Sequence, residues 1–190
     1  MNSIKSAAVV TAIFLAGCVS KPDGIIPVDQ FDAARYQGKW YEIARLDNRF
    51  ERGLSNVTAD YKARPDGGIT VTNRGYKDED AAWKQSEGKA YFVEGPTTGY
   101  LKVSFFGPFY GAYVVMDLDR EHYRYSLVTG NDKSYLWLLS RTPAMDDATK
   151  KRLVDKAQAL GYETSKLIWV DQARNLQVSK EPVSPQPASQ

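Results

Sequence analysis

Cysteine and histidine are almost absent from this sequence, which has one residue of each, Cys18 and His122, among 190. A single cysteine excludes an internal disulfide bond. His122 stands in a polar turn with no nearby cysteine and no Gly-x-Ser-x-Gly motif, so its surroundings match neither a metal-binding spacing nor a nucleophile elbow. The acidic pairs at 78–80 and 146–147 are interpreted as a solvated turn and a helix start. We therefore expect no catalytic residue, metal or cofactor.

A surplus of charge of one sign is also lacking. The 25 basic and 23 acidic residues give a formal net charge of +2 and are interspersed along the chain. Proteins that bind nucleic acid usually carry a basic face or stripe. The balance argues against a nucleic-acid partner and favours an uncharged or amphiphilic one.

The apolar run at residues 7–16 is shorter than the roughly 20 residues that a transmembrane helix needs. Lys5 precedes it, and a basic residue followed by a short apolar run is typical of a secretory signal peptide. We predict that residues 1–17 are a signal peptide that is removed during maturation.

The letters LAGC at 15–18 span the end of this signal peptide and resemble the lipobox of bacterial lipoproteins, which implies cleavage before Cys18. The resemblance implies acyl chains on Cys18, and several such chains anchor a protein almost permanently. In such lipoproteins an aspartate directly after the cysteine retains the product in the inner membrane. This chain has Val19 at that position, which implies the outer membrane and a periplasm-facing domain. An ordinary signal peptide with an incidental cysteine is the alternative. Residues 18–30, with Pro22 and Pro27, are predicted to be a lipidated tether.

Short alternating segments separated by turn residues then dominate the chain, a pattern typical of antiparallel strands. Eight are predicted, at 39–46, 56–63, 69–76, 83–93, 100–106, 110–118, 123–129 and 134–142. After Pro143 the spacing becomes helical over 147–160, and a further strand is expected at 166–170. Residues 173–190, with three prolines, are predicted to be a disordered tail.

This succession predicts an all-β fold with one C-terminal helix, an eight-stranded antiparallel up-and-down β-barrel over residues 31–172. Closure removes exposed strand edges, and eight strands leave room for side chains or one small ligand. A two-sheet sandwich is the architectural alternative, because short loops alone do not prove closure.

Three separated stretches resemble the lipocalin family, and in particular its bacterial outer-membrane lipoprotein branch. They are GKWYE at 38–42, DLD at 117–119 with the segment 123–128, and LSRTP at 139–143. The runs at 102–110 and 135–141 carry the resemblance to the bacterial branch. The resemblance implies that Arg141 lies over the indole of Trp40 at the closed end of the barrel, as a cation–π pair. It assigns Gly38, Trp40 and Arg141 a structural role in the barrel floor.

A ligand cavity is the leading hypothesis for function, and strand parity nominates part of its lining. The parity candidates are Ala59, Val71, Ala90, Phe92, Leu101, Val103 and Phe105. The lipocalin resemblance adds Tyr113, Val115, Val128, Trp137 and Leu139. The alternative is that these side chains simply fill a solid core.

The resemblance implies reversible binding of a fatty acid or lysophospholipid, in envelope lipid maintenance or stress. A binder anchored at a bilayer meets such lipids at a high effective concentration. Two other classes stay open. One is a protein-interaction module that uses the barrel rim, including a homodimer, through Trp83 or residues 106–110. The other is an enzyme, which the missing catalytic cluster disfavours.

Overall fold

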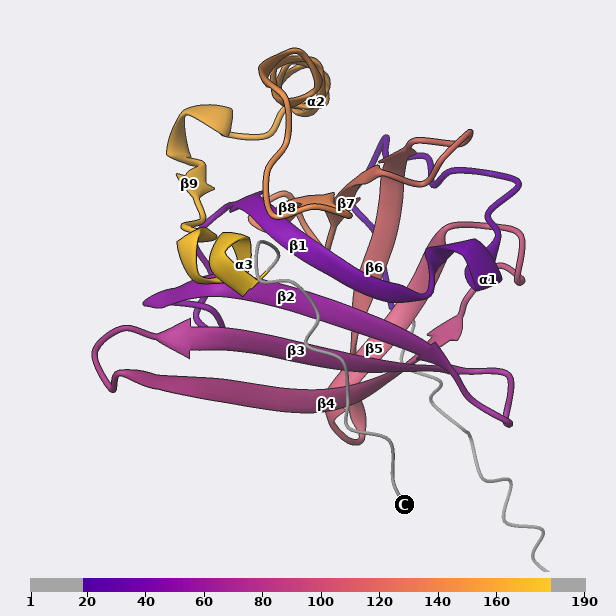
Figure 1. Ribbon diagram of the computed structural model, residues 1–190. Coiled ribbons are helices and arrows are strands. Elements are labelled where there is room, and N and C mark those ends of the chain that lie inside the picture. Colours follow the sequence, from indigo (N-terminus) through magenta and orange to yellow (C-terminus); the bar gives the residue numbers. More distant parts are fainter. Residues whose placement is uncertain (1–18, 179–190) are drawn as a thin grey trace, which may run out of the picture.

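The computed structural model describes residues 19–178, which form a closed β-barrel with a helix packed on its outside (Figure 1). The eight barrel strands are β1 (Gly38–Arg45), β2 (Leu54–Ala63), β3 (Ile69–Lys77), β4 (Ala82–Phe92), β5 (Tyr100–Phe106), β6 (Phe109–Leu118), β7 (Tyr125–Thr129) and β8 (Leu136–Ser140). Each strand pairs antiparallel with the next, and β1 pairs with both β8 and β2. The pairing of β1 with β2 and β8 closes the sheet, so the predicted barrel is confirmed and the sandwich is wrong.

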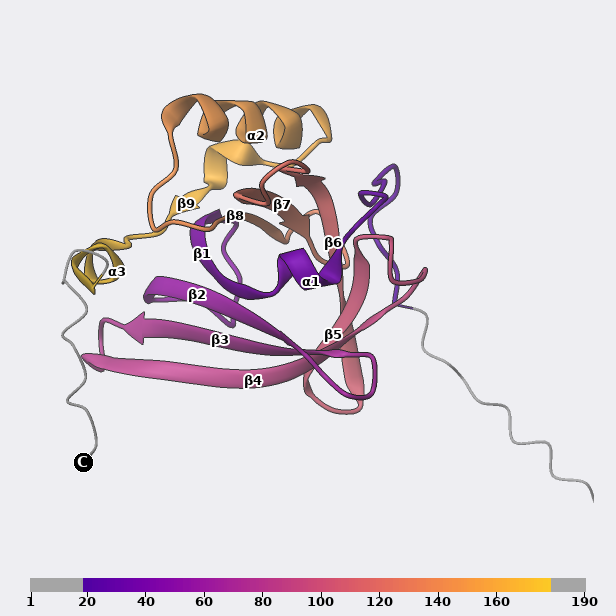
Figure 2. The same cartoon turned by 45° about the vertical axis from the view of Figure 1, so that its right-hand side comes forward.

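The outer layer is formed by helix α2 (Asp147–Ala159), as the change in periodicity predicts. Asp146 caps the helix by accepting a hydrogen bond of 2.8 Å from the Thr149 amide. Leu153 and Ala157 are fully buried against strands that are apolar on their outer face, in one cluster with Val114 and Leu138. Helix α2 therefore covers one flank of the barrel, which Figure 2 shows from the side.

No helix in the described part of the chain is long and apolar enough to cross a membrane.

One end of the barrel is sealed by a short helix that the sequence did not indicate, α1 (Ala33–Tyr36). Asp32 caps it by accepting hydrogen bonds from the amides of Ala34 and Arg35. The helix lays the Tyr36 ring against Trp40, with the ring centroids 4.6 Å apart, and the Trp40 indole donates to the Tyr36 carbonyl at 2.9 Å. Trp40 is wholly buried. The aromatic pair fills this end of the barrel.

Arg141 covers the sealed end from outside. Its guanidinium carbon lies 4.0 Å from the centroid of the Trp40 ring, and its nitrogens donate to the carbonyls of Arg35, Lys39 and Tyr123. Gly38 has a φ of +85°, a conformation that side chains disfavour, and the Arg141 guanidinium passes 3.6 Å from where its Cβ would be. These contacts tie the first strand to the loop after the last one.

The segment before the barrel is not the free tether that its prolines predict. Ile25 is 2% exposed and belongs to the outer core. The Val28 amide donates to the Val115 carbonyl at 2.9 Å, and the Val28 carbonyl accepts from the Gly99 amide at 2.8 Å. Apolar burial and backbone pairing outweigh the flexible composition, so residues 19–30 pack onto the barrel.

The predicted disordered tail is also wrong where the structure describes it. Residues 173–178 form helix α3 (Ala173–Val178), held to β2 by the Arg174 amide, which donates to Asn56 at 2.9 Å, and by Asn175. Gln172 beside it donates to the carbonyls of Glu42 and Val57. The rest of the tail, 179–190, lies outside the described residues.

Some strand boundaries also differ from the predictions. Tyr123 adopts a left-handed φ of 55°, so strand β7 begins at Tyr125. Strand β8 spans only Leu136–Ser140, because a turn at 133–134 precedes it and the chain bends at 141–143 after it. The expected last strand is reduced to β9 (Ile168–Trp169), which follows the 3-10 helix η1 (Thr164–Lys166) and pairs with the end of β1.

Two neighbouring isoleucines test whether the N-terminal segment is packed. Ile25 is 2% exposed and Ile26 is 81% exposed. We expect Ile25→Ala to lower the free energy of unfolding by about 2–4 kcal/mol, because it leaves a cavity in the outer core. Ile26→Ala, the matched control, should change it by less than about 0.5 kcal/mol. Urea titration of the chain from residue 19 measures both, and equal small effects would restore the free tether.

Candidate ligand cavity

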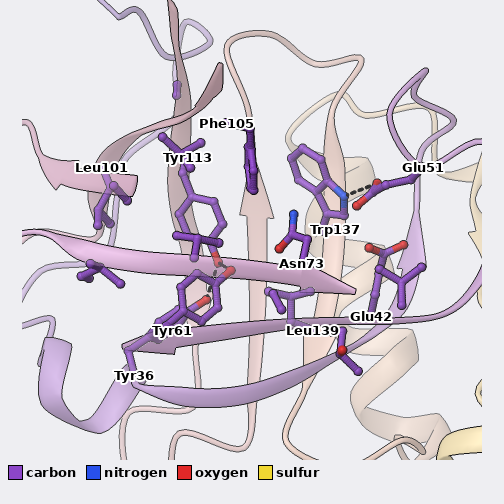
Figure 3. Close-up of a pocket in the computed structure, with 18 of the residues that line it drawn as sticks. Tyr36, Glu42, Glu51, Tyr61, Asn73, Leu101, Phe105, Tyr113, Trp137 and Leu139 are labelled. Atoms are coloured by element: carbon purple, nitrogen blue, oxygen red, sulfur yellow. Dashed lines mark hydrogen bonds between the residues drawn. The ribbon is translucent and has the colours of Figure 1, made fainter. Parts of the chain in front are cut away.

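An apolar cavity occupies the barrel above the sealed end. Its inner part has a volume of ≈ 120 Å³ and continues into a wider mouth of ≈ 760 Å³ at the opposite end. Figure 3 shows side chains from several strands converging on it. The two parts share the following lining residues: Glu51, Val57, Asn73, Val103, Phe105, Ala112 and Trp137. The interior is therefore not a solid core.

Most of the residues nominated from the sequence line this cavity. Those that do are Ala59, Val71, Ala90, Leu101, Val103, Phe105, Tyr113, Trp137 and Leu139. Strand parity predicts these inward-facing positions because the barrel strands are regular in their middle sections. There, successive residues face alternately into and out of the barrel.

Phe92, Val115 and Val128 do not line the cavity. Val115 and Val128 are fully buried in the inner core cluster, and the partly buried Phe92 packs against it. Phe31, which comes from the segment before α1, fills the space beside them, with its ring centroid 5.0 Å from Tyr36 and 6.2 Å from Phe92. Side chains that face inward near the sealed end are thus packed against other side chains. Strand parity alone cannot distinguish such a packed residue from one that lines a cavity.

The inner cavity carries a chain of tyrosine hydroxyls that the sequence analysis missed except for Tyr113. The Tyr36 hydroxyl donates to Ser126 Oγ at 3.1 Å. The Tyr113 hydroxyl lies 2.8 Å from both the Tyr36 and the Tyr61 hydroxyls. Each phenol has one proton. Tyr113 must therefore donate to Tyr36, and Tyr61 to Tyr113.

These phenols stay neutral. Burial raises the pKa of Tyr36 to about 12, although its bonds with Ser126 and Tyr113 favour ionisation. Burial likewise raises the pKa values of Tyr61 and Tyr113 well above their usual range. With every proton committed, the chain can accept one more hydrogen bond at Tyr61 but offers no spare donor to an anionic group.

Two glutamates form the second polar feature of the wall. Glu42 is 3% exposed, and its carboxylate accepts a hydrogen bond of 2.7 Å from the buried Arg45. The Trp137 indole donates to Glu51 Oε2 at 2.9 Å, and Asn48 also donates to that oxygen. Figure 3 shows both carboxyl groups beside Trp137 and Asn73. The wall here combines an aromatic ring with acids.

Glu42 holds its proton more tightly than an ordinary glutamate. Burial and, to a smaller extent, the neighbouring charge of Glu51 raise the pKa of Glu42 well above its usual range, against the opposing effect of Arg45. Arg45 also donates to the carbonyls of Glu51 and Leu54, at 2.9 and 3.1 Å, and fixes the loop between β1 and β2. Glu42 lies two residues after the inward-facing Trp40 on strand β1. The alternation of side chains along a strand could therefore have predicted that Glu42 faces the interior.

The mouth combines exposed phenyl rings with basic side chains. Phe106 and Phe109 are 72% and 79% exposed, and Phe50 is also exposed. The mouth lining also includes Arg49, Arg74 and Lys84. Arg74 lies over the Trp83 ring at 3.9 Å, and Lys84 pairs with Asp80 at 2.7 Å. An amphiphile whose chain enters the barrel would place its polar head among these groups.

His122 lies on the turn between β6 and β7, near Glu121 and away from the cavity lining. Among residues 19–178 there is no group of three or more His, Cys, Asp or Glu side chains that could hold a metal ion. The chemistry that the cavity offers is burial of apolar surface, with a few polar contacts.

Comparisons with known proteins agree with this architecture. The family profile described as "Lipocalin-like domain" matches residues 31–172. The chain is 54% identical over 164 residues to "Outer membrane lipoprotein Blc" of Vibrio cholerae, covering 86% of this chain and 96% of the relative. It is 53% identical over 175 residues to the protein of the same name in Escherichia coli K12, covering 90% and 98%.

Two more distant proteins extend the likeness. "Temperature-induced lipocalin-1" of Arabidopsis thaliana is 36% identical, with 74% of this chain and 78% of the relative covered. The structure of insecticyanin from the tobacco hornworm Manduca sexta matches the fold with a TM-score of 0.64 at 20% identity, covering 81% of this chain and 87% of that one. The sealed barrel, the family profile and these relatives together show that the chain belongs to the lipocalin family, in its bacterial Blc branch.

Proposed function

We propose that the protein binds one monoacyl lipid, a fatty acid or a lysophospholipid, while anchored through Cys18 to the periplasmic face of the outer membrane, and that it serves envelope lipid maintenance or stress. The chain belongs to the lipocalin family, and we propose that it acts as a binding protein and not as an enzyme. The observation that carries the proposal is the apolar cavity, closed at one end by Trp40 and open at the other. Two relatives from Vibrio cholerae and Escherichia coli that are named outer membrane lipoproteins support the anchor.

An acyl chain fits the shape and the chemistry of the cavity. Its walls are mainly aliphatic and aromatic, and the cavity narrows from a wide mouth to a single inner part. Each methylene group removed from water contributes about 0.8 kcal/mol. Eight buried methylenes would therefore supply roughly 6 kcal/mol before the cost of ordering the ligand. The narrow inner part, of ≈ 120 Å³, favours one chain.

The polar groups along the cavity bear on which head group is preferred. A chain that enters first by its tail leaves its head near Glu51 and the basic residues of the mouth. The carboxylate of a fatty acid would there meet the Glu51 carboxylate, and like charges in a partly buried site repel. A lysophospholipid can place its phosphate toward Arg49, Arg74 or Lys84. This contrast favours the lysophospholipid at neutral pH.

A pair of variants on strand β5 tests whether the cavity is the binding site. The Val103 side chain lines it, whereas Lys102 faces outward, with its ammonium 5.2 Å from the Tyr110 ring. We expect Val103→Trp to weaken binding of a fluorescent fatty acid at least about tenfold, because the indole occupies the acyl path. Lys102→Trp should stay within about twofold.

Circular dichroism controls for folding of both variants. Binding that Val103→Trp leaves unchanged would place the ligand elsewhere. If the parent protein binds neither the fluorescent fatty acid nor lysophospholipid, the rim-based interaction module, including a homodimer through the exposed phenyl rings, replaces the proposal.

The raised pKa of Glu42 predicts a pH response for one ligand class and almost none for the other. As pH rises through that pKa, which lies above the usual range of a glutamate, Glu42 loses its proton and the cavity becomes more negative. Fatty-acid affinity should therefore fall over that rise, while that of a zwitterionic lysophospholipid changes little. Glu51→Gln keeps a carbonyl acceptor for Trp137 and removes one charge. It should raise fatty-acid affinity at pH 8 about fivefold, equivalent to about 1 kcal/mol. Isothermal titration calorimetry measures both, and a fatty-acid affinity indifferent to pH and to this variant contradicts the role of the acids.

The mass of the mature protein tests the anchor. We expect protein extracted from membranes to begin at Cys18 and to carry the added mass of a diacylglycerol group and a further acyl chain. Intact-mass spectrometry followed by N-terminal fragmentation measures this. A mature chain with a free Cys18 thiol, or one cleaved at another position, rules the anchor out and restores the ordinary signal peptide.

A further inference from the structure

We propose that the lipid anchor and the ligand mouth lie at opposite ends of the barrel, so that the anchored protein turns its sealed end toward its own membrane and opens its cavity away from it. The inference rests on the proposed acylation of Cys18. It adds a membrane-facing surface and a direction of ligand exchange, neither of which follows from ligand binding itself.

The first argument is that the chain is fixed almost up to the anchor. The Tyr100 hydroxyl donates to the Val19 carbonyl, and Val19 packs at the edge of the outer core. Lys21 Nζ donates to the Ile25 carbonyl at 2.9 Å, and Ile25 itself is buried. Consecutive Cα atoms are ~3.8 Å apart, so residue 18 can be no further than that from the packed Val19. Little free chain separates the anchor from the barrel.

The second argument concerns where this packed segment lies. Val28 pairs with Gly99, and the Phe31 amide donates to the Thr97 carbonyl at 2.8 Å, so the segment follows the β4–β5 connection. In Figures 1 and 2 the described chain begins on the side of α1 and that connection, away from α3 and the β3–β4 turn. Strand β5 runs from Tyr100 beside this segment to Phe106 at the mouth. At about 3.3 Å per residue the two ends are roughly 20 Å apart.

The third argument is an aliphatic side chain that the fold leaves uncovered on the packed segment that follows the anchor. Ile26 is 81% exposed although its neighbours Ile25 and Val28 are buried. Val93, at the start of the adjoining β4–β5 connection, is 42% exposed. Apolar side chains beside an acylated residue gain free energy by entering the bilayer interface. We therefore assign the exposed side chains of Ile26 and Val93 to contact with the membrane leaflet that holds the anchor.

The exposed phenyl rings of the mouth offer the competing orientation. A bilayer in contact with Phe106 and Phe109 lies at the far end of β5 from Val19. An anchor at residue 18 could reach it only if residues 19–28 detached, which would expose Ile25 and break the pairing of Val28 with Val115. The two orientations therefore exclude each other while the segment stays packed. In the one that we propose, ligand reaches the cavity from the aqueous side.

Cys18 is the only cysteine, which makes the orientation measurable. Protein beginning at Cys18 is coupled through its thiol to a maleimide-headgroup lipid in phosphatidylcholine vesicles that contain brominated acyl chains, which quench tryptophan. Two reporters are compared with the parent protein, Ile26→Trp and Phe106→Trp. Both positions are mostly exposed, at 81% and 72%, so both variants should fold.

We expect Ile26→Trp to lose about half of its added emission when coupled, because interfacial side chains lie within ~5–10 Å of the acyl boundary. Phe106→Trp should keep its added emission. Quenching of Phe106→Trp, with or without Ile26→Trp, overturns the inference, as does the absence of quenching at both. Thiol-blocked, uncoupled protein gives the baseline. Because coupling is chemical and needs no ligand, the result is independent of natural acylation and of lipid binding, which are measured separately.

Discussion

Sealing one end of the barrel around the indole of Trp40 is the constraint on which the rest of the structure depends. A closed sheet of eight strands satisfies its own edges, but each end needs side chains to keep water out. Tyr36 fills the space inside against Trp40, and Arg141 covers the ring outside while binding three backbone carbonyls. The contacts join helix α1, strand β1 and the loop after β8. The seal leaves only the other end of the barrel free to admit a ligand.

The polar groups inside the cavity divide by depth into a fixed set and a titratable one. Near the seal, the tyrosine chain ends at Ser126 with all of its protons committed, so it adds no charge. Closer to the mouth, Glu42 and Glu51 stand beside Trp137, and burial keeps a proton on Glu42 to higher pH than usual. Under the proposed function, an apolar chain can thus pass deep into the barrel. The charge of its head group would then interact with Glu42, Glu51 and the basic side chains of the mouth.

Much of this architecture could be predicted from the sequence, because strands, turns and helix α2 are local patterns. Parity placed Val71, Leu101 and Val103 on the cavity wall for the same reason. The rest depends on contacts between distant segments. Phe31 turns Val115 from a wall residue into packed core, Ile25 is ordered by burial against the barrel, and α3 is held by Asn56. Glu42 was missed because an acid is seldom expected on the inner face of a barrel. Its burial is made possible by the ion pair with Arg45.

The central claim is that the barrel holds a single lipid chain rather than a filled core. Native mass spectrometry of the protein, released from membranes without detergent, tests this most directly. The account predicts a population heavier than the apoprotein by the mass of one monoacyl lipid, which is lost when a competing fatty acid or lysophospholipid is added. Protein that carries no lipid and takes up none when either is supplied would contradict it.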